Sequence, residues 1–214
     1  MVVCEYRLKS LLLSKMHIMP TTAIQKKTSN TPALPKKKQR RISWKVFQKQ
    51  YLTLEDEYKY EWLDGVVEKT KRTMDYSQFF IQKNLLGFLE QLRISKKVNG
   101  WLIAEGDAFF NGHHRRPDIA YFTDEQVEEA RKGGKPVPQF VIEVISNYDA
   151  LKKVHEKMED YFSAGVPVIW HILPDLKQVH VYHGKEMIIH TGEEICSAAP
   201  VLPDFALAVN EVFK

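Results

Sequence analysis

The chain has 214 residues, enough for one domain with an appendage, and its 44% of hydrophobic residues suffices for a core. Its 27% of charged residues is ordinary for a globular protein and excludes a chain that is disordered throughout. No stretch reaches the roughly 18 apolar residues of a membrane span. The N-terminus lacks a signal-peptide core, and Cys4 and Cys196 form no metal-ligand spacing. We therefore expect a cytoplasmic protein without a membrane partner.

The net charge of +4 conceals an uneven distribution of basic residues. Residues 1–45 hold eleven Lys/Arg and one acid, a net of +10, so the remaining 20 basic and 26 acidic residues leave −6. Residues 1–42 are rich in Lys, Thr, Ser and Pro without periodicity. We interpret them as a basic, disordered extension before a domain at 43–214. Their basic run could attract phosphates, or it could be a plain solvated tail.

The first half of the domain carries local signals for a helix, a hairpin and a second helix. Ser43 is a suitable N-cap for a short helix. Asp64-Gly65 between two β-prone runs predicts a hairpin over 58–69. A long helix is expected over 76–93, because one apolar stripe recurs there at spacings of three and four: Ile81, Leu85, Phe88, Leu89 and Leu92. A strand from Trp101 to Phe110 follows.

Residues 111–116 contain His113-His114 beside Arg115-Arg116, which could bind phosphate or metal. Adjacent residues on a flexible turn seldom chelate together, so we expect a solvated loop there. Beyond it the sequence predicts further elements in this order: a strand opened by Asp118, a helix over 125–132, a strand over 140–145, a helix over 150–164, a strand over 168–173 and a hairpin over 179–190. This order favours an α/β fold with a mixed central sheet flanked by helices and hairpins added at both ends.

A lone carboxylate, Glu143, lies inside an apolar strand. Its burial is costly unless a metal, a cation or hydrogen bonds compensate it. If the strand opened by Asp118 is its neighbour, both carboxylates can converge on one Mg²⁺ or Mn²⁺ ion, whose shell water and phosphate oxygens would complete. Each acid also has an ordinary explanation: Asp118 as a turn residue after Pro117, and Glu143 as a buried ion pair with an arginine.

Lys157 lies on the predicted helix that follows the Glu143 strand. The apolar stripe of that helix is Leu151, Val154, Met158 and Phe162. Lys157 stands about 100° from the stripe centre, where a long side chain can still extend toward the sheet. An ion pair within the helix, with Asp160 or a neighbour such as Glu156, is the structural alternative. Lys152 and Lys153 point further out and are expected to be surface charges.

The ordered motifs resemble the restriction-endonuclease-like "Uma" family of bacteria, which belongs to the PD-(D/E)XK nuclease superfamily. The resemblance covers about residues 44–213 and is carried by these segments: Tyr58 to Gly65, Arg116 to Ala120, Val141 to Ser146, Glu156 to Val166, Trp170, and Leu202 to Leu207. It implies a metal-dependent endonuclease that hydrolyses phosphodiester bonds in DNA. Asp118 and Glu143 would bind Mg²⁺ or Mn²⁺, Lys157 would orient the attacking water or stabilise the phosphorane, and Glu61 would assist. For Glu61, an exposed strand residue is the alternative.

Three departures from the family pattern leave a second function open. The superfamily lysine would fall at Ile145, so the helix must supply Lys157 instead, and Ser146-Asn147 replaces the usual Ser-Pro. A histidine common in the family corresponds to Gln78, which could hold a water or the ion, or be a satisfied buried amide. The alternative is a catalytically inactive nuclease-fold protein that binds nucleic acid or a protein partner. Cleavage of both DNA strands would ordinarily need two sites, hence a possible homodimer.

Overall fold

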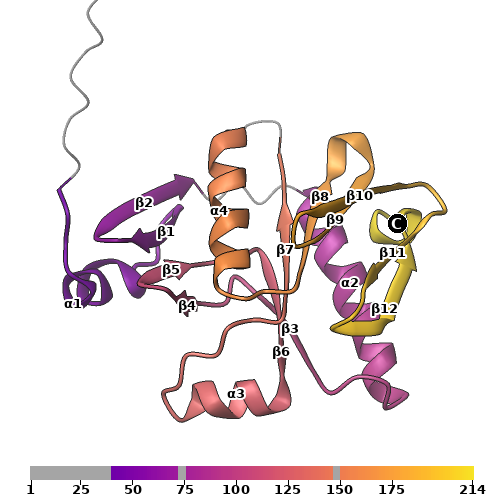
Figure 1. Cartoon of the computed structure of the whole chain (residues 1–214), viewed down its shortest axis with the longest axis horizontal. Coiled ribbons are helices and arrows are strands. Elements are labelled where there is room, and N and C mark those ends of the chain that lie inside the picture. The colour runs from indigo at the N-terminus through magenta and orange to yellow at the C-terminus, as the bar shows by residue number, and fades with distance from the viewer. Residues whose placement is uncertain (1–39, 72–75, 147–149) are drawn as a thin grey trace, which may run out of the picture. The chain divides into compact units, whose positions relative to one another are not determined.

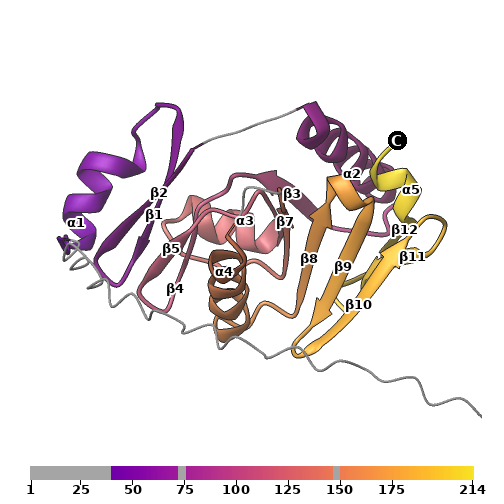
Figure 2. The ribbon, with the colours of Figure 1, turned by 90° about the horizontal axis from the view of Figure 1, so that it is seen from above.

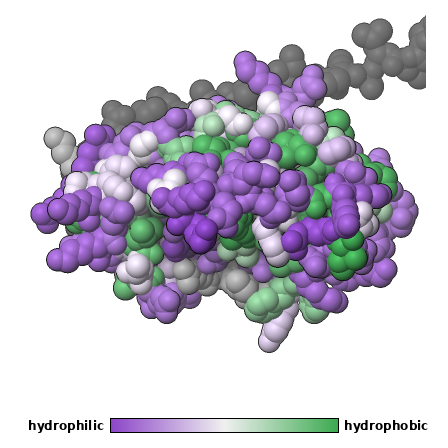
Figure 3. Space-filling view, turned by 90° about the horizontal axis from the view of Figure 1, so that it is seen from below, coloured by the Kyte–Doolittle hydropathy of each residue, from purple (hydrophilic) through white to green (hydrophobic). Residues whose placement is uncertain are grey.

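The computed structural model describes residues 40–71, 76–146 and 150–214, which belong to one compact unit. Most of the predicted basic extension, residues 1–39, and Asn147 lie outside the described residues. Figure 1 shows the elements of the unit in chain order. Among the described helices, none is both long and apolar enough to cross a bilayer. Seen from below, hydrophilic side chains cover most of the surface, with hydrophobic groups scattered between them (Figure 3).

A six-stranded sheet forms the centre, in the order β10-β9-β8-β7-β6-β3. Its strands are β3 (Gly100–Ala104), β6 (Ile119–Thr123), β7 (Phe140–Val144), β8 (Val168–Leu173), β9 (Gln178–His183) and β10 (Glu186–Thr191). Only β7 and β8 pair in parallel, and helix α4 (Leu151–Ser163) provides the crossover that such a pair requires. The predicted mixed α/β sheet is thereby confirmed.

Alternate residues of β7 face opposite sides of the central sheet, and helices lie on both of these sides (Figure 2). Phe140, Ile142 and Val144 pack in a core cluster with helix α2 (Tyr76–Ile94). That cluster also holds three elements that the sequence did not indicate: β11 (Ile195–Ala198), β12 (Leu202–Ala208) and helix α5 (Val209–Val212). Val141 faces the other way, toward Tyr161 of α4 and Val127 of α3 (Asp124–Arg131). Glu143 shares this second face, so its carboxylate points toward α4.

A four-stranded sheet, β2-β1-β5-β4, stands beside the central one. It is preceded by α1 (Trp44–Phe47), which Ser43 caps, and by a π-helical turn, Gln48–Leu52. Strands β1 (Tyr58–Leu63) and β2 (Val66–Lys71) form the predicted hairpin. Asp64 and Gly65 both have positive φ, 47° and 89°, as a tight hairpin turn of this kind requires.

Two predictions about residues 101–116 were wrong. The expected strand from Trp101 to Phe110 breaks at Glu105, whose φ is 48°, so that β3 and β4 (Ala108–Phe110) lie in different sheets. The expected solvated loop contains strand β5 (His113–Arg115), which pairs with both β1 and β4. Arg115 is only 2% exposed because it meets carboxylates from distant parts of the chain.

Candidate active site

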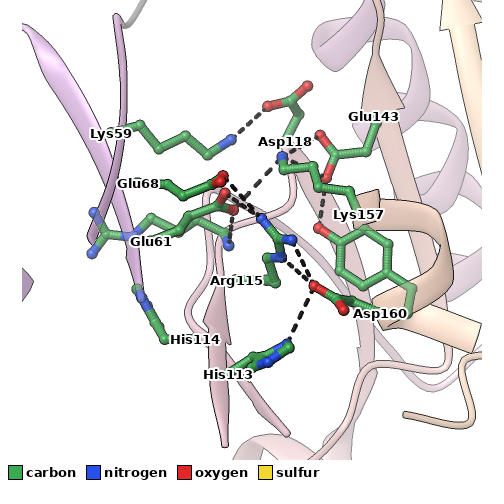
Figure 4. A network of polar contacts seen from close by, with 12 residues as sticks. Lys59, Glu61, Glu68, His113, His114, Arg115, Asp118, Glu143, Lys157 and Asp160 are labelled. Carbon is green, nitrogen blue, oxygen red and sulfur yellow. Dashed lines mark hydrogen bonds and ion pairs between the residues drawn. The ribbon is translucent and has the colours of Figure 1, made fainter. Parts of the chain in front are cut away.

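A pocket of about 550 Å³ lies between the β1–β2 hairpin, the ends of β6 and β7, and α4. All four predicted site residues line it: Glu61, Asp118, Glu143 and Lys157. Gln78 of α2 and His171 of β8 also contribute to the lining, together with Lys59, Lys69, Lys71 and Lys153. Lys153, predicted to be a plain surface charge, therefore faces the same space. Figure 4 shows the centre of this group.

Asp118 and Glu143 come together because β6 and β7 are neighbours. Ile119 pairs with Ile142 in the antiparallel register, which sets Asp118 beside Glu143 one residue further along. The Val144 N–H donates to Asp118 Oδ2 at 2.8 Å and fixes that carboxylate at the strand end. Burial, and then the charge of Asp118, raises the pKa of Glu143, as expected for two carboxylates in one buried site.

Lys157 contacts the carboxylate that the sequence predicted for it. Its Nζ lies 3.0 Å and 3.1 Å from the two Glu143 oxygens and 3.6 Å from Glu61 Oε1. The hydroxyl of Tyr161 donates to Glu143 Oε1 at 2.6 Å. Burial and the charge of Glu143 raise the pKa of Tyr161 well above its usual value, so the phenol keeps the proton that it donates.

The position of Lys157 on α4 differs from the prediction. Leu151 is 85% exposed, so the apolar stripe does not begin there. The inward side of the helix instead carries Val154, Lys157 and Tyr161 at spacings of three and four residues, which places the lysine in the middle of that face. The alternative of an ion pair within the helix is not realised: Lys157 pairs with Glu61 and Glu143, while Asp160 pairs with Arg115 and Glu156 with Lys152.

Glu61 is buried, so its interpretation as an exposed strand residue was wrong. Its carboxylate accepts hydrogen bonds from Arg115 Nη1 at 3.0 Å and from the Arg116 N–H at 2.8 Å. Burial alone would raise the pKa of Glu61, but the charges of Lys157, Lys59 and Arg115 outweigh it and lower that pKa to about 2. Glu61 therefore stays ionised and holds Lys157 from the side opposite Glu143.

Two cations of the site were missed from the sequence. Arg115 also donates to Asp160 Oδ2 from Nε at 2.8 Å and from Nη2 at 2.6 Å, and it lies 3.5 Å from Glu68. Lys59 lies 2.8 Å from Asp118 Oδ1. One signal pointed to Lys59: it stands two residues before Glu61, so strand alternation puts both side chains on one face of β1.

The net charge of this cluster is compatible with a bound divalent cation. Ion pairs link three cations, Lys59, Lys157 and Arg115, to five carboxylates: Glu61, Glu68, Asp118, Glu143 and Asp160. When all of these groups are ionised, the cluster has an excess of two negative charges. Among the described residues, no group of three or more His, Cys, Asp and Glu could hold a metal ion. Asp118 and Glu143 together still fit Mg²⁺ or Mn²⁺, since one or two carboxylates usually suffice when phosphate and water complete the shell.

The remaining candidates have different surroundings. Gln78 lines the pocket and is half-buried. The Asp107 carboxylate accepts hydrogen bonds from the His114 ring and from Arg116 Nε. His171 pairs in register with Glu143, and burial together with the charges of His180 and Lys157 lowers its pKa to about 4. His171 is therefore neutral at pH 7.

A protein of known structure shares this fold. This chain is similar to a protein described as a "putative nuclease belonging to DUF820" from Anabaena variabilis ATCC 29413, with a TM-score of 0.66 and 19% identity over 80% of this chain and 97% of that chain. A family model described as "Uma2: Putative restriction endonuclease" matches residues 47–210. The chain belongs to the Uma2 family, and the resemblance found in its motifs is confirmed. No curated protein matches the sequence.

Proposed function

We propose that this protein is a metal-dependent DNA endonuclease that hydrolyses phosphodiester bonds. The observation that carries the proposal is the Lys157 ammonium, held 3.0 Å from Glu143, whose strand neighbour is Asp118. Two acids and one lysine at a pocket are the minimum set for this chemistry. Membership of a family described as restriction endonucleases supports DNA as the substrate and a divalent ion as the cofactor. A DNA substrate supports the cytoplasm as the compartment in which the protein acts.

The chain's own residues would divide the work as follows. Asp118 and Glu143 would hold Mg²⁺ or Mn²⁺, which when bound would supply an activated water and neutralise charge on the phosphate. Lys157 orients the attacking water or stabilises the phosphorane with its ammonium. Tyr161 fixes the Glu143 carboxylate by its 2.6 Å hydrogen bond. Glu61 assists by keeping Lys157 charged and in place, since it lies 3.6 Å from that ammonium.

Plasmid DNA incubated with the purified protein and Mg²⁺, Mn²⁺ or EDTA tests the proposal. We expect cleavage with either ion and none with EDTA. Glu143→Gln should abolish cleavage and weaken Mn²⁺ binding in calorimetry at least about tenfold, because one of two charged ligands is lost. Glu156→Gln, on the exposed side of α4, is the matched control and should behave as the wild type. Equal Mn²⁺ binding by Glu143→Gln would refute the assignment of this ligand. DNA binding without ion-dependent cleavage would instead favour the inactive nuclease-fold alternative.

We also propose that the basic extension contributes much of the non-specific DNA affinity. The Ile42 N–H donates to the Gly65 carbonyl at 2.8 Å, so a truncation should spare Ile42. Deleting residues 1–39 removes eight Lys/Arg and one acid. The slope of log affinity against log salt should then become shallower, because fewer counterions are released. Filter binding at several salt concentrations measures it, with a Gly/Ser extension of equal length as the control. An unchanged slope would mean that DNA does not contact this segment.

The last part of the proposal is a homodimer, since cleavage of both strands requires two active sites. Light scattering on the purified protein, alone and with DNA, measures its molar mass and so distinguishes a monomer from a dimer.

A further inference from the structure

We propose that Lys59 is a built-in competitor for the divalent cation. In the metal-free protein its ammonium occupies Asp118, and it leaves that carboxylate when Asp118 takes the ion. This inference rests on the proposed function, because it concerns the same site. It adds a control on ion binding that neither the family nor the acid pair implies.

The contact between Lys59 and Asp118 is short and partly buried, and the Asp118 side chain is 24% exposed. Nζ lies 2.8 Å from Oδ1, and the lysine side chain is only 10% exposed. Among the described residues, Asp118 is the only carboxylate in an ion pair with Lys59. Lys59 thus supplies the positive charge that Asp118 needs in the absence of metal.

Of the groups that hold the two acids, Lys59 is the one that can leave most easily. The Val144 N–H on Asp118 Oδ2 belongs to the backbone of β7 and cannot move without breaking the sheet. Lys157 is held by both oxygens of Glu143 and also by Glu61. Lys59 is held by one carboxylate and sits on a flexible stem that comes from the other sheet.

A divalent ion and the Lys59 ammonium would repel each other if both contacted Asp118. Once the Lys59 ammonium moves aside, Lys157 and Arg115 are left with five carboxylates, an excess of three negative charges when all are ionised, so the cluster can accommodate a divalent ion. Lys59 also lines the pocket, where the phosphate of bound DNA would be its next anionic partner. A compact ammonium with three donors suits that second contact. The Lys59 ammonium would then move from the Asp118 carboxylate to the phosphate of the substrate.

Calorimetric titration of the full chain with Mn²⁺ tests the competition. Lys59→Met keeps the length of the side chain without its charge, and it should bind Mn²⁺ about tenfold more tightly than the wild type. Lys59→Arg should bind more weakly, because a guanidinium pairs with a carboxylate through two hydrogen bonds. Lys152→Met is the matched control and should leave the affinity unchanged, because the Lys152 side chain is 85% exposed and pairs with Glu156 on the exposed side of α4.

The outcomes separate this inference from the proposed function. If Lys59→Met binds Mn²⁺ as the wild type does, or more weakly, Lys59 only positions Asp118 and the competition is refuted. If the wild type and Lys59→Met are both folded and neither binds Mn²⁺, the proposed metal site itself has failed. Thermal melting is recorded first. Should Lys59→Met not fold, Lys59→Gln replaces it, because an amide can still donate to Asp118 without carrying a charge.

Discussion

Lys157→Met should reduce the rate of plasmid cleavage by about 10²–10³-fold, the usual cost of losing one group that stabilises developing charge. The ammonium is 3.0 Å from Glu143 and 3.6 Å from Glu61, and no other cation is paired with Glu143 among the described residues. Lys157→Arg should recover only part of the activity, because a planar guanidinium does not fit the space of a compact ammonium. Single-turnover cleavage at saturating Mn²⁺ measures the loss in the chemical step.

The control for Lys157 is Lys152→Ala. Lys152 lies on the same helix, with its side chain 85% exposed and paired with Glu156. Lys153 is unsuitable because it lines the pocket. Since Lys157→Met leaves two buried carboxylates without their shared cation, the variant also loses stability, and the assay belongs well below its melting temperature. Full activity of a folded Lys157→Met, or equal damage by Lys152→Ala, would exclude a catalytic role for Lys157.

Arg115→Met should destabilise the protein by about 3–5 kcal/mol at pH 7, the usual cost of removing one partner from a buried ion pair. The guanidinium is 2% exposed and contacts Glu61 and Asp160. Arg131→Met is the control, because its pair with Glu128 is exposed and should contribute less than about 1 kcal/mol. Urea unfolding of both variants measures the difference. A loss no larger than that of Arg131→Met would mean that the buried network contributes little to stability.

The loss of stability in Arg115→Met should depend on pH. The pKa of Glu61 is about 2 in the folded protein, below its ordinary value of 4.5, so its contribution to stability is complete above pH 4.5 and is lost as the pH falls through 2. Without Arg115 that pKa is lowered less. The destabilisation should therefore be largest near neutral pH and should shrink toward pH 2. Unfolding curves between pH 7 and pH 3 test this trend, and a constant difference would contradict it.

The parts of the fold that the sequence predicted are those with local causes. The hairpin depends on Asp64-Gly65, and α2 on an apolar stripe that lies within the helix itself. The proximity of Asp118, Glu143 and Lys157 followed from the order of β6, β7 and α4. The hairpin and the helix are thus each predicted from residues within the element itself, and the site from the order of its elements along the chain.

The missed parts have causes distant in the sequence. The sequence of strand β5 predicts a polar loop because His113, His114 and Arg115 are charged or polar. The partner carboxylates of Arg115 lie 54 and 45 residues away along the chain. The inward face of α4 was misplaced because Leu151 is apolar yet exposed. Lys59 could be paired with Asp118 only once the two sheets were seen to meet. Periodicity alone cannot supply such contacts.

The cluster around Glu143 draws its side chains from β1, β5, the start of β6, β7 and α4, a span from Lys59 to Tyr161. A chain still on the ribosome cannot assemble this cluster until α4 has emerged and packed on the sheet. A proteolytic fragment that lacks either the hairpin or α4 also lacks charges that the other part needs. For the proposed nuclease activity, this arrangement means that an incomplete chain could not cleave DNA.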